Sequence, residues 1–389
     1  LITQCNEVIT KYGESTEPEI IQYVAEARFW RAFSYDKLYH LFGTVPLVTG
    51  SQDIKNGIAR ASQEEMESFI ETELADVEKV LPETYSSTDY GRPTSWAVKA
   101  TLARYYLNKK DWKKASIYAK EIIDKGGFNL VDYQDIFSKN QNDEVILAIN
   151  HIAEANHGNK YVALVLEASI RDALGITGVS ASNGYGMAVP FFRTFDPDDK
   201  RITPYNPATG KGIAVSGIVY KSDGTPVYGT PEEPKSVEEQ LSRILTFKWE
   251  VQTNIPLGED ASLNVPALRL GEVMLTYAEA ENELGHLEEA KTYVDKIRSR
   301  AGLENLPANL NMASMRDAIL DERGWELYHE GYRREDLVRH GKLLEKVNEK
   351  YHYYFGKDMP WKNNNDRILQ PIPTNALLLN PLLKQNPGY

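Results

Sequence analysis

Five charged residues near the end of the chain have the residue types and the spacing to interact with one another. They are Glu326, Glu330, Arg333, Asp336 and Arg339. Carboxylates held beside arginines are a common arrangement in general acid–base catalysis. On a helix, however, spacings of three and four residues let opposite charges pair along one face. We therefore predict a half-buried structural ion network that holds the last helices together, rather than a catalytic pair.

Known catalytic and metal-binding motifs are missing elsewhere in the sequence. His329 is followed by a glutamate, but it lacks the second histidine of a zinc protease. Asp196, Asp198 and Asp199 lack the glycine and the glutamate of a calcium loop, so we interpret them as a turn. The single cysteine, Cys5, cannot form an internal disulfide or a cysteine-rich metal site. We predict no catalytic residue, no metal, no cofactor and no enzymatic activity.

Aromatic side chains are better candidates for binding. The chain has 23 tyrosines and 6 tryptophans. A flat ring can pack on the apolar face of a sugar, while amides, carboxylates and arginines bind its hydroxyl groups. Rings at helical spacing are predicted to lie in the core: Tyr23, Trp30, Phe69, Tyr106 and Trp325. Rings in irregular segments are the predicted ligand-binding residues: Tyr185, Tyr205, Tyr220, Tyr228, Trp249, Tyr353 and Trp361, with Tyr85 and Tyr90 in a loop between two helices. Trp249 is the most ambiguous, because a short strand at 247–249 would turn it toward the core.

Composition and charge narrow the possible partners. The 389 residues are 42% apolar and 26% charged, as in ordinary folded proteins. The net charge of −12 argues against a nucleic-acid partner, which needs a basic face, and fits neutral ligands better than acidic ones. No apolar run approaches the roughly 18 residues of a membrane-spanning helix. The first residues contain neither a charged leader nor an apolar stretch, so we expect the natural chain to begin before Leu1.

Helical periodicity dominates both ends of the chain. The predicted helices are Glu19–Phe42, Ser62–Leu81 (opened by a capping box), Thr94–Leu107, Trp112–Ile123, Ala267–Glu283, Leu287–Arg300, Met312–Glu330 and Arg334–Lys350. Residues from about 172 to 265 are rich in Gly, Pro, Ser and Asn, which predicts a loop-rich insertion. Within it, we expect short strands near Ile213–Tyr220 and one helix opened by a second capping box at Ser236–Glu239.

Two helix pairs repeat with an offset of 175 residues. Ala103 aligns with Ala278 and Ala115 with Ala290, and each pair ends at a glycine. Small residues twelve apart, where two antiparallel helices cross, are typical of a tetratricopeptide repeat. Because such repeats bury their core only by stacking, we predict one domain over residues 1–389. It would contain helical repeats at about 19–171 and 266–350, the insertion at about 172–265, and a proline-rich tail at 368–389.

Several segments, in order along nearly the whole chain, resemble the SusD/RagB family of outer-membrane nutrient-binding lipoproteins. They are Glu26–Phe33 followed by Leu41–Leu47, Arg92–Leu107, Arg269–Ala280, Glu322–Leu327, Glu330–Arg333, Asp336–Arg339, and the ending Gln385–Tyr389. The resemblance implies a mainly α fold, with four tetratricopeptide-like helix pairs in a right-handed stack and a loop-rich insertion containing short β-strands. The ligand site varies within the family, so no site residue is carried over.

The resemblance also implies a function. It indicates a non-catalytic cell-surface lipoprotein of Bacteroidetes-type bacteria that captures an oligosaccharide. The implied partner is a SusC-like, TonB-dependent outer-membrane transporter, which takes the ligand over. Cys5 lacks a lipoprotein signal before it, so we expect the lipid anchor on a preceding segment. Two alternatives stay open: capture of peptides by a RagB-like lid on the same kind of importer, and a helical scaffold that binds protein alone.

Overall fold

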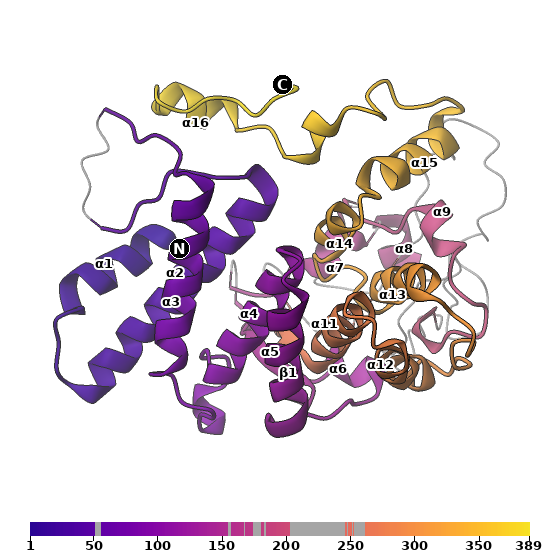
Figure 1. Cartoon of the computed structure of the whole chain (residues 1–389), viewed down its shortest axis with the longest axis horizontal. Helices are drawn as coiled ribbons and strands as arrows, with labels where there is room; N and C mark the ends of the chain where they lie inside the picture. The colour runs from indigo at the N-terminus through magenta and orange to yellow at the C-terminus, as the bar shows by residue number, and fades with distance from the viewer. Residues whose placement is uncertain are drawn as a thin grey trace.

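The computed structural model describes residues 1–50, 56–154, 157–166, 168–173, 180–182, 184–202, 246, 248–250, 252 and 261–389. Helices dominate this part of the chain (Figure 1), as the sequence predicted. The longer helices are α1 (Ile2–Tyr12), α2 (Pro18–Phe42), α3 (Gln63–Glu78), α4 (Ser95–Asn108), α5 (Trp112–Lys125), α11 (Leu270–Glu283), α12 (Leu287–Arg300), α13 (Met312–Glu326) and α15 (Leu343–Phe355). The shorter ones are α6 (Tyr133–Ile136), α7 (Tyr161–Val165), α8 (Ala168–Ala173), α9 (Val189–Phe192), α14 (Arg333–Arg339) and α16 (Thr374–Leu379), with single 3-10 turns at Ser87–Asp89, Lys200–Ile202 and Asn365–Ile368. None of the helices described here is both long enough and apolar enough to cross a membrane.

The predicted helices of the first half are confirmed, and one was missed. Pro18 opens α2, where its missing N–H costs nothing. The capping box of α3 is present: Ser62 Oγ accepts from the Glu65 amide at 3.1 Å, and the Glu65 carboxylate accepts from the Ser62 amide at 2.7 Å. Helix α1 was not predicted from the sequence; it precedes α2 and packs against it (Figure 1).

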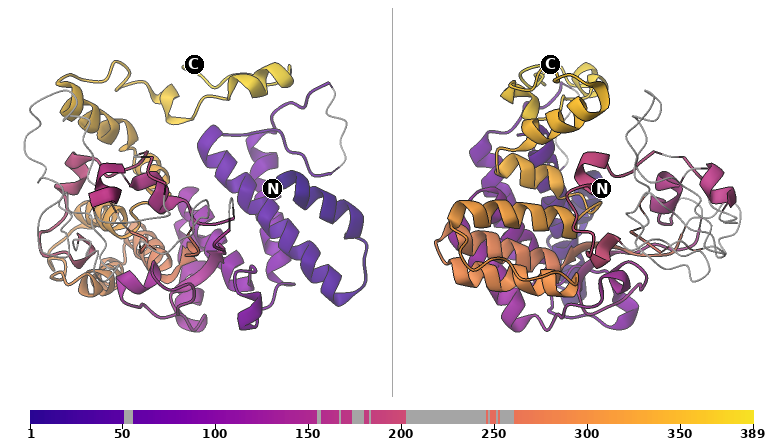
Figure 2. Two further views of the ribbon diagram at one scale, coloured as in Figure 1. Left: turned by 180° about the vertical axis from the view of Figure 1, so that it is seen from behind. Right: turned by 90° about the vertical axis from the view of Figure 1, so that its right-hand side faces the viewer.

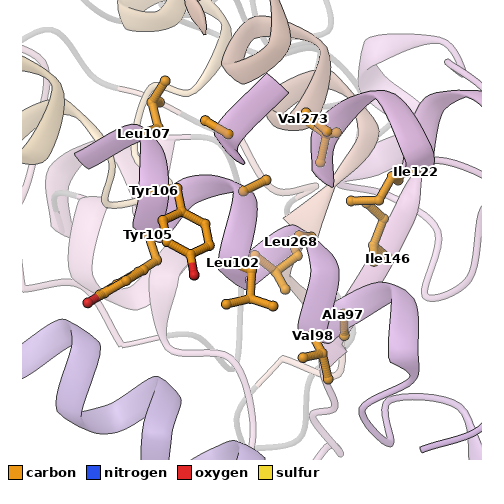
Figure 3. Close-up of a cluster of buried hydrophobic side chains, with 14 of the residues drawn as sticks. Ala97, Val98, Leu102, Tyr105, Tyr106, Leu107, Ile122, Ile146, Leu268 and Val273 are labelled. Carbon is orange, nitrogen blue, oxygen red and sulfur yellow. The ribbon is translucent and has the colours of Figure 1, made fainter. Parts of the chain in front are cut away.

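The two repeated pairs, α4–α5 and α11–α12, form the centre of the molecule. The alanines that align between the repeats, Ala103, Ala115, Ala278 and Ala290, are all buried. Their small side chains let the helices approach closely, so that α11 packs against both α5 and α12. Larger side chains from both pairs and from the neighbouring strands fill the space around them (Figure 3).

A two-stranded antiparallel sheet joins the chain before the insertion to the chain after it. Its strands are β1 (Val145–Ile149) and β2 (Val265–Arg269). The prediction of a helix from Ala267 was therefore wrong at its start: pairing with β1 and the presence of Pro266 keep this stretch extended until α11 begins. Helices α7, α8 and α9, which come between the strands in sequence, lie to one side of the helical layer (Figure 2). The expected strands near Ile213–Tyr220 and the helix at Ser236–Glu239 lie outside the described residues.

The last helical region is more broken than the sequence suggested. Helix α13 ends at Glu326, four residues early, and His329 beyond it has a positive φ of 61°. The predicted helix Arg334–Lys350 is two helices, α14 and α15, separated at Gly341, whose φ of 68° is one that glycine adopts easily. The expected boundaries of the repeats, the insertion and the tail stay a prediction.

The tail crosses one end of the molecule, from α15 to α16 (Figure 1). Two asparagines of the tail form hydrogen bonds with the end of α2 and the segment after it. The Asn386 side chain donates to the Phe42 carbonyl at 3.0 Å and accepts from Arg60 at 2.7 Å. Asn380 donates to the Ile58 carbonyl at 2.8 Å. The tail thus packs on the end of α2 and the segment that follows it.

Candidate functional site

Tyrosines and an arginine gather where the start of α2 meets the loop between α3 and α4. Gln22, Tyr23 and Glu26 lie in the early turns of α2, with the spacing that places them on one side of a helix. Tyr85 and Arg92 come from the loop. The Arg92 guanidinium carbon lies over the Tyr85 ring at 4.5 Å and over the Tyr23 ring at 5.0 Å from each centroid. We call these five residues the Arg92 cluster.

Hydrogen bonds to Glu26 hold the cluster in one geometry. Arg92 donates two hydrogen bonds to Glu26 Oε1, at 2.5 and 3.0 Å, and the Tyr85 hydroxyl donates to the same oxygen at 3.0 Å. Gln22 donates its amide to the Tyr85 hydroxyl at 2.9 Å. Partial burial and the nearby Glu26 carboxylate raise the pKa of Tyr85 to about 12, so its hydroxyl keeps its proton. The hydrogen bonds from Arg92 to Glu26 raise the pKa of Arg92 further above its usual range.

The rest of the loop is anchored to the end of β1. Asn150 donates to the Tyr90 carbonyl, and Gly91 has a φ of 95°. A side chain at Gly91 would meet Asn150, because a Cβ atom there would lie 2.5 Å from Asn150 Nδ2. The Tyr90 ring is half-buried, and burial raises the pKa of its hydroxyl to about 12. The loop is therefore fixed on two sides, by α2 and by β1.

The Arg92 cluster has the chemistry of a binding surface. Tyr23 is 44% exposed, which leaves part of its ring open to solvent. Rings, a planar amide and carboxylates at a shallow surface are the groups that pack on sugars and bind their hydroxyls. The hydrogen bonds described for the Glu26 carboxylate all come from donors, namely Arg92, Tyr85 and Gln22.

Comparison with known proteins agrees with the sequence resemblance. A model described as "SusD family" matches residues 215–389, and one described as "Starch-binding associating with outer membrane" matches residues 2–107. The chain belongs to the SusD-like family. Among curated relatives, SusD-like protein P2 of Formosa agariphila is 28% identical, over 100% of this chain and 79% of its own length. Starch-binding protein SusD of Bacteroides thetaiotaomicron is 24% identical, over 100% of this chain and 76% of its own.

Solved structures show the same fold. A SusD-like protein from Bacteroides fragilis matches with a TM-score of 0.78 at 23% identity, over 100% of this chain and 84% of that one. A laminarin-binding SusD-like protein matches with a TM-score of 0.76 at 23% identity, over the same shares. Members of the SusD-like family are non-catalytic. The prediction that this chain is not an enzyme agrees with that family assignment.

The other aromatic residues predicted for this SusD-like chain do not share one surface. Trp249 is only 3% exposed and packs at 4.3 Å from Tyr161 and 5.1 Å from Phe137, between ring centroids. The prediction that Trp249 stacks on a ligand was therefore wrong, because the indole lies in a second buried cluster with Tyr133, Phe137 and Phe195. Tyr185 is 58% exposed, on the segment beside Leu164. Tyr205, Tyr220 and Tyr228 lie outside the described residues.

A second exposed aromatic group lies after α15. Trp361 is 37% exposed, and Arg367 lies over its ring at 5.9 Å and over the Tyr389 ring at 4.2 Å. Close by in sequence, a groove of about 700 Å³ runs between α14, α15 and residues 362–368. Tyr353 on α15 is half-buried under Arg193, at 5.5 Å. This group shares no residue with the Arg92 cluster.

Four of the five charged residues predicted as one network belong to two separate networks, and Arg333 forms no ion pair among the described residues. Glu326 and Glu330 accept from Arg269, at 2.6 and 2.7 Å. Asp336 and Arg339 pair with each other at 2.8 Å. Further partners were not foreseen from the sequence. Two of them, Glu322 and Arg323, lie in α13 itself. The others come from other segments: Glu144, Asp199, Arg201, Lys248, Glu279 and Arg300. Arg333 donates to the Leu320 carbonyl at 2.6 Å.

Both ion networks lie in the interior of the protein and are structural. The side chains of Glu326, Glu330 and Arg269 are at most 1% exposed. Burial alone would raise the pKa of Glu326, but Arg300 and Arg269, together with a third arginine, hold it well below its usual range. A fully buried, fully paired carboxylate is not available to a ligand, so the Arg92 cluster is the stronger candidate site.

Four residues of that cluster were not predicted as site residues from the sequence: Gln22, Tyr23, Glu26 and Arg92. Tyr23 was expected in the core because of its helical spacing, yet it is largely exposed. Glu26 and Arg92 were noted only within longer segments of resemblance. The sequence did contain a signal that Tyr23 is not a core residue. Its neighbours on the same face of α2, Gln22 and Glu26, are polar.

Proposed function

We propose that this protein is a cell-surface glycan-binding component of an outer-membrane nutrient uptake system. It captures oligosaccharides and passes them to a SusC-like, TonB-dependent transporter. Names of relatives support the ligand class, since one is described as starch-binding and another as laminarin-binding. The association with the outer membrane is supported by the description of the model that matches residues 2–107. The anchor would be a lipid on a segment that precedes Leu1.

The observation that carries the proposal is the Arg92 cluster. Its two tyrosine rings are stacked with one guanidinium and braced by Glu26, so a sugar would meet rings that are already ordered. Pre-ordering matters, because each side chain immobilised on binding costs about 0.5–1.5 kcal/mol. We include Tyr85, Tyr90 and Tyr23 in the proposed site. Tyr185, Tyr353 and Trp361 are a second choice, and Tyr205, Tyr220 and Tyr228 remain predictions.

Binding to polysaccharides tests this proposal. The purified protein is run in native gels containing starch, laminarin or other neutral glycans, and those that retard it are titrated by calorimetry. A mixed peptide digest serves as the alternative ligand. We expect saturable binding to at least one glycan class and none to the peptides. Retardation by no glycan would refute the proposal, and a response to peptides alone would favour the RagB-like alternative.

Point variants locate the site. Tyr85→Ala and Tyr23→Ala each remove a ring without opening the core, and each should weaken glycan binding about tenfold, equivalent to about 1.4 kcal/mol. Trp361→Ala is the matched control, because it removes an exposed ring that is also stacked with an arginine. It should bind as the wild type does. If Trp361→Ala loses binding and Tyr85→Ala keeps it, the site is the second aromatic group.

A further inference from the structure

We infer that the Arg92 cluster selects neutral glycans and disfavours sugars that carry carboxylate or sulfate groups. This inference rests on the proposed function and adds the class of substrate. It starts from where the charges of the cluster point. Arg92 donates to Glu26 at 2.5 and 3.0 Å and to Asp89 at 3.1 Å, so three of its N–H groups are already directed to carboxylates.

The carboxylates outnumber the cation. Glu19 accepts from the Tyr23 hydroxyl at 2.9 Å, which places a third carboxylate at the cluster beside Glu26 and Asp89. Among α2 residues 18–28 and loop residues 83–93, the other cation is Arg28. It is occupied too, by Glu73 at 2.7 Å and by a second carboxylate of α3. Within these two segments, a bound anion would therefore meet net negative charge and no guanidinium that lacks a carboxylate partner.

Hydrogen bonding also favours neutral sugars over anionic ones at this cluster. Sugar hydroxyls can donate to carboxylate oxygens, and such charge-assisted hydrogen bonds are strong. The Asp89 side chain is 43% exposed and can accept them. An ionised carboxylate or a sulfate ester on the ligand has no proton to donate there and would be repelled. Sites built for anions instead present arginines whose N–H groups are free to bind in pairs.

The test compares neutral glycans with derivatives of the same backbone that carry carboxylate groups. Laminarin and starch are compared with their carboxymethylated derivatives, by calorimetry at 20 mM and 500 mM NaCl. We expect the carboxymethylated form of whichever glycan binds to bind at least tenfold more weakly at low salt. The gap should narrow at high salt, because salt screens exposed charges.

Two variants separate the cluster from the charge of the whole chain. Asp89→Asn removes one negative charge at the cluster and should reduce the affinity ratio of neutral to carboxymethylated glycan several-fold. Glu349→Gln removes one negative charge from an exposed pair with Lys346 on α15 and should leave the ratio unchanged. An equal effect of both variants would overturn the inference in favour of net charge.

The outcomes distinguish this inference from the function it rests on. Equal or tighter binding of the carboxymethylated glycans by the wild type overturns neutral selectivity and leaves glycan capture standing. Failure of both the neutral and the charged forms to bind refutes glycan capture itself.

Discussion

Replacing Arg269 with methionine should destabilise the protein by about 3–5 kcal/mol, the cost of breaking a buried ion pair from one side. The Arg269 side chain is fully buried and donates to three carboxylates: Glu144 at 2.7 Å, Glu326 at 2.6 Å, and Glu330 at 2.7 Å. It also donates to the Glu326 carbonyl at 2.9 Å. The substitution leaves these acceptors in the interior with one cation fewer.

The size of the destabilisation by Arg269→Met follows from the numbers of positive and negative side chains in the buried network. In the described part of this network, the cations are Arg201, Lys248, Arg269, Arg298 and Arg300, and the anions are Asp199, Glu144, Glu322, Glu326 and Glu330. The charges cancel, so the loss of Arg269 leaves one uncompensated negative charge. At about 2.1 cal/mol/K per residue, unfolding 389 residues carries an entropy of roughly 0.8 kcal/mol/K, and the expected fall in Tm is roughly 4–6 °C.

The assay is scanning calorimetry of the wild type and the variants, with urea unfolding as a second measure. Lys346→Met is the matched control, since it breaks an exposed pair with Glu349 and should cost less than about 1 kcal/mol. The double variant Arg269→Met with Glu330→Gln restores neutrality and should be less destabilised than the sum of its single variants. The reasoning would be refuted by an Arg269→Met protein whose Tm matches that of Lys346→Met.

Two further predictions concern the same network. Burial lowers the pKa of Lys248 to about 8, although Glu330 at 2.6 Å and the Glu326 carbonyl favour its charged form. The folded state therefore favours the neutral amine, and the contribution of Lys248 to stability rises with pH from 8 toward 10.5, by up to about 3 kcal/mol. In calorimetric scans from pH 8 to 10.5, the Tm of the wild type should rise relative to that of Lys248→Met. A Tm difference that stays constant over this range would contradict the lowered pKa of Lys248. Gly271→Ala should lower the free energy of unfolding by about 1–3 kcal/mol, although alanine has the better helix propensity. The reason is that the alanine Cβ would lie 2.5 Å from Arg269 Nη1. A raised Tm would show that the Arg269 side chain can shift to make room for the methyl group.

The helical stack was predictable because its signals are local. Apolar spacing located the helices of both repeats to within a few residues of their ends, and the capping box at Ser62 located the start of α3. The wrong start of the helix predicted from Ala267 has a non-local cause, which is pairing between segments far apart in sequence. The strand at Val265–Arg269 exists because β1, more than a hundred residues earlier, pairs with it. No helical period at Ala267 could reveal that partner.

The candidate site was only partly predictable, for a related reason. Tyr85 was selected because it lies in a loop, and the structure places it in the Arg92 cluster. Tyr23 was assigned to the core because helical spacing does not tell which face of α2 is covered. The side that carries Tyr23 meets a polar loop rather than another helix, and this contact depends on Arg92, 69 residues later.

Depth separates the two places where this chain combines arginine, carboxylate and aromatic rings. Arg269 lies 5.9 Å from the centroids of both Tyr133 and Phe137. Its guanidinium donates its hydrogen bonds to buried carboxylates and to a buried carbonyl, and a ligand has no access to it. Around Arg92 the same chemistry is only partly buried, and an ion pair that solvent reaches contributes less to stability than a buried one. The position of Arg92 is better explained by its effect on neighbouring side chains. Its guanidinium orders the rings of Tyr23 and Tyr85, whose outer edges remain in solvent. For that reason we expect substitutions at Arg269 to change stability first and substitutions at Tyr85 to change binding first, and a reversal of this order would mean that the two sites have been assigned the wrong way round.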